Sequence, residues 1–316
     1  MNIQLIEMTD KELIETTTHS SKGNQLKWQL NDKWIKADYL GYEGLSEFMV
    51  SNLLKKTNVL NFTQYHLEQI KYKKNIYTGC SSENFLQKDE SILTLEKLFR
   101  MYYGIEISEK CAKIEDIKEK IKYTVDRVIE VTGLQDFGKY LTTLLEVDAI
   151  FLDEDRHFNN IAVIYNENNN TFNYCPIFDN GAALLSDTVM DYPLGEDVYN
   201  YIDQVQAKPF STNFEEQMDA AESLYGVQLR YWIENRDIEY LIDEIRESHL
   251  YPDEIINRVE TCTKEQVHKY VYMKTAPPKQ EQKHFIPMES KNISYQPIIA
   301  QEDIDKNRHA EQWLDR

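Results

Sequence analysis

The chain has 316 residues and a mass of 37.4 kDa, with a hydrophobic fraction of 41% and a formal net charge of −19 at pH 7. This length and apolar content are enough for a two-lobed protein with a substantial core, which excludes a globally disordered chain. The negative charge argues against nucleic acid as a main partner, because non-specific phosphate binding needs basic side chains. A polyanionic ligand would therefore have to be held by a metal ion and a few local cations.

The cysteines and the N-terminus indicate a protein made in the cytosol. The four cysteines are far apart in the sequence and lack the spacing of a zinc site: Cys80, Cys111, Cys175 and Cys262. Scattered thiols are typical of a reducing compartment, and a disulfide framework is not expected. The first residues lack the basic flank and apolar core of a secretory signal, and no window reaches the length of a membrane span. We expect a soluble protein, with export by a route that needs no cleavable signal left open.

The first part of the chain has the pattern of a small β-rich lobe. Residues 24–40 alternate apolar and polar side chains around an Asn-Asp-Lys turn, which predicts a β-hairpin. Residues 43–56 repeat apolar side chains at helical spacing, which predicts a helix. A further strand is expected at residues 75–80, followed by a connector at residues 81–85.

The rest of the chain is mostly helical in pattern, beginning at about residue 91. Residues 137–152 have the apolar stripe of a buried helix. Residues 161–165 and 171–178 are expected to be short strands joined by an Asn-rich turn. Helices are expected to continue to about Lys274, before the composition becomes polar.

These patterns predict an α+β, two-lobed fold with a small antiparallel sheet, one important helix and a larger helical lobe. The predicted divisions are an N-terminal lobe at residues 1–85, a helical lobe at residues 86–276 and a C-terminal extension at residues 277–316.

A polar constellation surrounds the predicted hairpin of the second lobe. Asp155 and Asn160 lie on one loop, and Asp179 follows beyond the hairpin, which would bring it back beside Asn160. In phosphoryl transfer from ATP, one carboxylate orients the acceptor hydroxyl, while an amide oxygen and a second carboxylate hold Mg²⁺. In the first lobe, Lys36 can reach the phosphates and Glu47 on the next helix can pair with it.

The ordered set resembles the HipA-like serine/threonine kinases, whose protein-kinase-like fold is related to that of the phosphoinositide kinases. The resemblance covers residues from about 20 to beyond 191 and continues more weakly through the later helices. It is carried by the segments SSKGNQ, DRHFNN and FDNG together with Lys36 and Glu47.

The resemblance implies a role for each matched position. Asp155 matches the catalytic aspartate, and Asn160 and Asp179 match the metal-binding pair. Lys36 matches the lysine that binds the nucleotide, with Glu47 as its helix partner.

The resemblance also implies two nucleotide-contacting segments, a phosphate loop and an interlobe hinge that contacts adenine through backbone groups. The phosphate loop has one glycine, so side chains are expected to assist the backbone, and a serine of this loop can be autophosphorylated in the family; a plain polar turn is the alternative. The phosphate-loop residues are Ser20, Ser21, Lys22 and Gly23. The hinge residues are Cys80, Ser81, Ser82, Glu83, Asn84 and Phe85.

Two departures from ordinary protein kinases affect the site. Arg156 and His157 follow the catalytic aspartate instead of preceding it, and Asn180 stands between the aspartate and glycine of the metal motif. We expect His157 to brace the loop, and Arg156 to contact either phosphate or an acidic neighbour such as Asp153. Asp153 and Glu154 themselves are expected to be solvated acids at a helix end.

The sequence thus predicts an ATP- and Mg²⁺-dependent serine/threonine protein kinase that can phosphorylate itself. The alternatives are a lipid or small-molecule kinase, and a nucleotide-binding pseudokinase that acts as an interaction module. Expected partners are ATP and a protein with a Ser or Thr acceptor. The resemblance leaves two biological roles open: growth control in the bacterial cytoplasm, or a translocated bacterial effector in host proinflammatory signalling.

Overall fold

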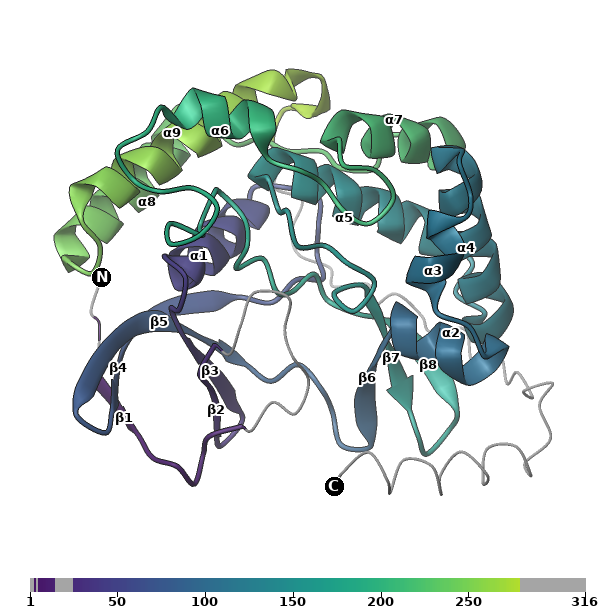
Figure 1. Cartoon of the computed structure of the whole chain (residues 1–316), viewed down its shortest axis with the longest axis horizontal. Coiled ribbons are helices and arrows are strands. Elements are labelled where there is room, and N and C mark those ends of the chain that lie inside the picture. The colour runs from purple at the N-terminus through teal and green to yellow at the C-terminus, as the bar shows by residue number, and fades with distance from the viewer. Residues whose placement is uncertain (1–2, 4, 15–24, 279–316) are drawn as a thin grey trace.

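The structure, a computed structural model, describes residues 3, 5–14 and 25–278. It combines a curled sheet in the first part of the chain with a helical second part that carries a smaller sheet (Figure 1). The predicted α+β, two-lobed architecture is confirmed.

The first sheet has the strand order β1-β4-β5-β3-β2. The predicted hairpin at residues 24–40 is confirmed as β2 and β3, with Leu30 opposite Lys33. Strand β1 runs parallel to β4, a pairing that the antiparallel prediction did not include. The strands are β1 Leu5–Met8, β2 Lys27–Leu30, β3 Lys33–Ala37, β4 Tyr65–Tyr72 and β5 Asn75–Glu83.

Strand β5 is longer than predicted. It pairs with β3 and β4 as far as Glu83, so the expectation of a connector at residues 81–83 was wrong. Two neighbouring strands satisfy its backbone hydrogen bonds, and these partners are not visible in the local sequence.

Helix α1, Glu43–Leu54, packs on β4 and β5 and also contacts the helical part at α8. The predicted helix at residues 43–56 is confirmed. Almost all of its residues are buried, because the sheet covers one side and the second lobe the other. Glu47 therefore lies inside the protein, between the two lobes.

The second sheet has the order β6-β7-β8, from β6 Glu90–Thr94, β7 Ala162–Asn166 and β8 Thr171–Tyr174. The predicted hairpin is confirmed by β7 and β8, but its second strand ends at Tyr174 and not at residue 178. The helix expected from residue 91 begins only at Leu95, because residues 90–94 pair with β7, a strand distant in sequence. Thr94 then caps α2 by accepting a hydrogen bond from the Lys97 backbone N–H.

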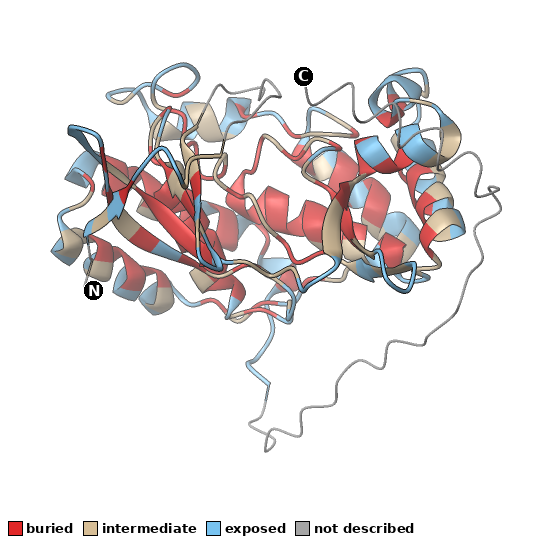
Figure 2. Cartoon of the chain, turned by 90° about the horizontal axis from the view of Figure 1, so that it is seen from below, coloured by how far each residue is buried: buried red, intermediate tan, exposed pale blue. Residues whose placement is uncertain are grey.

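Helix α5 lies in the centre of the second lobe, and buried residues are concentrated around it (Figure 2). One continuous apolar core runs from α1 of the first lobe through α5 to the last helices. No helix in the described part of the chain combines the length and hydrophobicity of a membrane span. The helices of this lobe are α2 Leu95–Tyr103, α3 Ile107–Ala112, α4 Ile117–Thr132, α5 Phe137–Phe151, α6 Val198–Gln204, α7 Phe214–Tyr225, α8 Asn235–Ser248 and α9 Asp253–Lys269.

Candidate active site

The predicted polar residues of the second lobe lie on two loops that flank the β7–β8 hairpin. Helix α5 ends at Phe151, and the left-handed backbone of the next residue, Leu152 (φ 55°), turns the chain out of the helix and into the first loop. Asp155 and Asn160 lie on this loop before β7, and Asp179 lies on the loop after β8. Asp179 also has a left-handed backbone, with φ 59°, a conformation that Asp adopts more readily than most residues.

Lys36 joins the first lobe to the second. Its Nζ donates to Glu47 Oε1 and to Asp179 Oδ1, both at 2.7 Å, and lies 5.3 Å from the centroid of the Tyr65 ring. The side chains of Lys36, Glu47 and Asp179 are 13%, 1% and 30% exposed. The structure therefore brings together three residues that the sequence placed on separate elements.

The charges of this trio are mutually dependent. The Lys36 ammonium holds the pKa of the Asp179 carboxyl well below its usual range. Burial opposes the charged form of Lys36, but Asp179 and Glu47 still raise its pKa well above the ordinary value. Burial raises the pKa of Glu47 despite the neighbouring ammonium, because this carboxylate is almost completely removed from water.

Asp155 has polar neighbours on both carboxylate oxygens. Lys208 Nζ donates to Oδ1 at 2.9 Å, and His157 Nε2 lies 3.6 Å from Oδ2. The Asn160 amide nitrogen donates to the Asp155 carbonyl at 2.9 Å, which fixes the loop between them. Sequence reasoning missed Lys208, because a single lysine 53 residues after Asp155 carries no local signal.

Arg156 contacts acidic neighbours, which decides between the two partners predicted for it. Its Nε donates to the Asp148 carboxylate at 3.0 and 3.1 Å, and its Nη2 donates to Asp153 Oδ2 at 2.8 Å. The guanidinium is fully buried. The prediction that Asp153 and Glu154 are solvated was wrong: both are buried, and Glu154 accepts a hydrogen bond from the Tyr192 hydroxyl.

The same guanidinium ties the two loops together. Arg156 Nη1 donates to the carbonyls of Phe178 at 2.9 Å and of Asn160 at 3.3 Å, and Nη2 donates to Asn180 Oδ1 at 2.8 Å. Phe178 and Asn180 flank Asp179. Arg156 therefore holds the loop of Asn160 beside the loop of Asp179, as the hairpin argument required.

The Asp153 carboxyl makes the stability of the protein depend on pH. Burial raises its pKa to about 6, although Arg156 acts in the opposite direction. A carboxyl whose folded pKa lies above its unfolded value contributes stability below about pH 4 that is lost as the pH rises through about 6. We expect the free energy of unfolding of Asp153→Asn to lack this fall between pH 4 and 6. The free energies of unfolding can be measured by urea titration at several pH values. An equal fall for the variant and the wild type between pH 4 and 6 would contradict this prediction.

Comparison with solved structures identifies the fold. The structure matches the Helicobacter pylori proinflammatory kinase CtkA with a TM-score of 0.56 at 16% identity, over 84% of this chain and 95% of that chain. This chain shares the fold of CtkA. The predicted kinase-like fold is thus confirmed.

A second solved structure matches more weakly. HipA of Shewanella oneidensis MR-1, solved with HipB and operator DNA, matches with a TM-score of 0.35 at 12% identity, over 95% of this chain and 65% of that chain. That score is too low to indicate a shared fold. No protein-family model and no curated protein matches the sequence.

Within the CtkA fold of this chain, Asn160 and Asp179 have the chemistry of Mg²⁺ ligands. The amide nitrogen of Asn160 is committed to the Asp155 carbonyl, so its amide oxygen is the atom left to bind a cation. Asp179 is held ionised by Lys36 and is partly exposed. No cluster of three or more His, Cys, Asp or Glu suited to a metal occurs among the described residues. Two oxygen ligands, completed by phosphates and water, fit Mg²⁺.

The nucleotide-contacting segments predicted for the CtkA-like fold are only partly described. Ser20, Ser21, Lys22 and Gly23 lie outside the described residues. Residues 80–83 of the hinge segment belong to β5, and residues 84–85 begin the connection to β6. Cys80 is buried, and Phe85 packs against Phe178 with ring centroids 5.9 Å apart.

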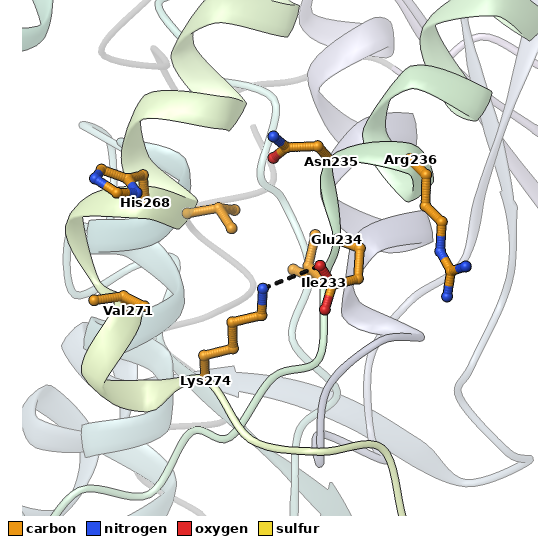
Figure 3. Close-up of a pocket in the computed structure, with 8 residues that line it drawn as sticks. Ile233, Glu234, Asn235, Arg236, His268, Val271 and Lys274 are labelled. Carbon is orange, nitrogen blue, oxygen red and sulfur yellow. Dashed lines mark ion pairs between the residues drawn. The ribbon is translucent and has the colours of Figure 1, made fainter.

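A separate pocket of about 500 Å³ lies between the start of α8 and the end of α9 (Figure 3). Glu234 and Lys274 face each other across it at 3.2 Å. None of the residues proposed for phosphoryl transfer lines it. The pocket is therefore a feature separate from the candidate active site. Its lining residues are Ile233, Glu234, Asn235, Arg236, Val267, His268, Val271 and Lys274.

Proposed function

We propose that the chain is an ATP- and Mg²⁺-dependent serine/threonine protein kinase that also phosphorylates itself. The observation that supports this most directly is the position of Lys36 Nζ, 2.7 Å from both Glu47 and Asp179 and between the two lobes. A lysine held in this way presents a fixed positive charge to the phosphates of a nucleotide. The fold shared with the kinase CtkA also supports this activity.

Each residue of the candidate site has its own role in the proposed phosphoryl transfer. Lys36 positions the phosphates, and Asp155 orients the Ser or Thr hydroxyl and accepts its proton. Mg²⁺, held by Asn160 and Asp179, would supply neutralisation of the phosphate charge. Arg156 keeps both loops at the required spacing through its hydrogen bonds to the carbonyls of Asn160 and Phe178. The rate would then come from positioning and electrostatic stabilisation.

Intact-mass and phosphopeptide analysis after incubation with Mg²⁺-ATP tests this function. We expect wild type to gain phosphate on Ser or Thr, and Asp155→Ala to gain none in the same time because it lacks the hydroxyl-orienting carboxylate. Asp243→Ala, which removes an exposed carboxylate in α8, serves as the matched control and should behave as wild type. Nucleotide binding without transfer to protein would contradict the protein-kinase proposal, and transfer to a phosphoinositide instead would establish the lipid-kinase alternative.

At the cellular level we propose a bacterial effector that acts on a host signalling protein. This extension is supported by the fold shared with a kinase described as proinflammatory. Delivery of the wild type into cultured human macrophages should raise cytokine release, and delivery of Asp155→Ala should not. Equal release with both proteins would remove the extension without affecting the phosphotransfer proposal.

A further inference from the structure

We propose that Lys208 is a catalytic residue whose ammonium neutralises the phosphoryl group as it passes from ATP to the acceptor hydroxyl. The inference rests on the proposed kinase function and adds a residue to its site. Lys208 lies 53 residues after Asp155, in the segment between α6 and α7, and its Nζ donates to Asp155 Oδ1 at 2.9 Å.

The contact with Asp155 places the ammonium near the reacting atoms. In the proposed reaction, the acceptor hydroxyl lies within hydrogen-bond reach of Asp155, and its oxygen stands about 3–3.5 Å from the phosphorus that it attacks. The Lys208 ammonium contacts the same carboxylate, so this side chain can reach the phosphoryl group that is transferred. The two Asp155 oxygens face different partners, because His157 lies 3.6 Å from Oδ2 while Lys208 takes Oδ1.

Two other cations of the site, Lys36 and Arg156, are engaged elsewhere. Lys36 is shared between Glu47 and Asp179 at the nucleotide side of the site. Arg156 is fully buried and bonded to acids, so it serves the loops instead of a ligand. The Lys208 side chain is 44% exposed, against 13% for Lys36 and 0% for Arg156, and so is the most accessible of the three.

The segment that carries Lys208 is fixed by contacts on both sides. The Gln217 amide of α7, itself fully buried, donates to the Lys208 carbonyl at 3.0 Å and accepts from the Phe210 N–H at 3.3 Å. The Phe210 ring packs edge-on against Phe158, with centroids 5.5 Å apart. Phe158 belongs to the same loop as Asp155. The segment that carries Lys208 is thus packed against the loop that carries Asp155.

The balanced step assigns each charge. The acceptor oxygen forms a bond to the γ-phosphorus of ATP as its proton passes to Asp155. The bond between the γ-phosphorus and the bridging oxygen breaks, and its electron pair leaves with ADP. Lys208 gives up neither a proton nor electrons, and its charge stabilises the equatorial oxygens of the phosphoryl group during transfer.

The test compares Lys208→Met, Lys208→Arg and the matched control Lys139→Met, which removes an exposed, carboxylate-paired lysine of α5. We expect Lys208→Met to lower kcat about 100-fold while the KM for ATP changes less than about threefold. Lys208→Arg keeps the positive charge and should remain within about tenfold of wild type. Lys139→Met should match wild type.

A second readout does not depend on turnover. Mg²⁺-ADP with aluminium fluoride mimics the transferring phosphoryl group, and Lys208→Met should bind this combination about 100-fold more weakly than wild type while binding Mg²⁺-ADP equally well. Equal affinity of both proteins for the aluminium fluoride complex would overturn the inference. A loss of Mg²⁺-ADP binding or thermal stability in both Lys208 variants would also overturn it, since that pattern indicates a structural role. If wild type transfers no phosphate, the proposed function fails, and the aluminium fluoride comparison still decides the role of Lys208.

Discussion

Replacement of Arg156 by methionine is expected to lower the free energy of unfolding by about 3–5 kcal/mol. Methionine would fill much of the same space, but it would leave the buried carboxylates of Asp148 and Asp153 without their cation. Removing one partner from a buried ion pair is costly because the remaining charge has lost its solvation by water. In thermal unfolding, the midpoint should fall by roughly 5–8 °C for a protein of this size.

The matched control for this substitution is Arg246→Met, which removes an exposed guanidinium paired with Asp243 and Asp253. Surface pairs of this kind contribute at most about 1 kcal/mol. The penalty of Arg156→Met should also be smaller at pH 5 than at pH 8, because protonation neutralises the carboxyls left behind. Burial raises the pKa of Asp148 well above its ordinary value even beside the Arg156 guanidinium, and removal of that cation would raise it further. Equal penalties in the two arginine variants would show that the buried network does not stabilise the fold.

Replacement of Asp179 by asparagine is expected to lower the rate of phosphoryl transfer at least about 1,000-fold, with little change in the fold. Asparagine adopts the left-handed backbone that this position requires and can still accept the hydrogen bond from Lys36. It removes the negative charge that would hold Mg²⁺. Transfer should be measured at saturating ATP, and Mg²⁺ dependence by titrating ADP binding with and without the ion.

The control for this charge change is Asp203→Asn, an exposed carboxylate in α6. Wild type and the control should bind ADP more tightly when Mg²⁺ is present, whereas Asp179→Asn should lose most of this difference. Retention of more than one tenth of the wild-type transfer rate by Asp179→Asn would exclude Asp179 as a metal ligand. Loss of ADP binding in the absence of Mg²⁺ would instead indicate that the substitution disturbs Lys36.

Local sequence patterns were sufficient for the elements that carry the candidate site. The hairpin of β2 and β3, helix α1 and the β7–β8 hairpin each have the periodicity and turn residues of their conformation, and all three were predicted. Lys36 lies on a strand, Glu47 on the next helix and Asp179 beyond a hairpin. This order, read with the chemistry of phosphoryl transfer and the resemblance to kinases, predicted that the three residues lie together. The structure places them within hydrogen-bond distance.

What the sequence could not supply depends on contacts between distant segments. Arg156, Asp148 and Asp153 look like surface residues by type, and their burial becomes possible only when the two loops and α5 enclose them together. Strand β6 was mistaken for helix because its partner β7 lies far along the chain. Lys208 reaches Asp155 only through the packing of a segment that follows α6.

Asn180, the residue inserted between aspartate and glycine, has a consequence for how such a protein would be controlled. Its backbone N–H donates to Glu47 Oε2 at 2.9 Å, and its side-chain oxygen accepts from Arg156. An outward swing of α1, which carries Glu47, would therefore break the bonds of Glu47 to Asn180 and to Lys36 together, and would leave the buried Lys36 ammonium with Asp179 as its remaining hydrogen-bonded carboxylate. An off state built on helix displacement would be energetically expensive here.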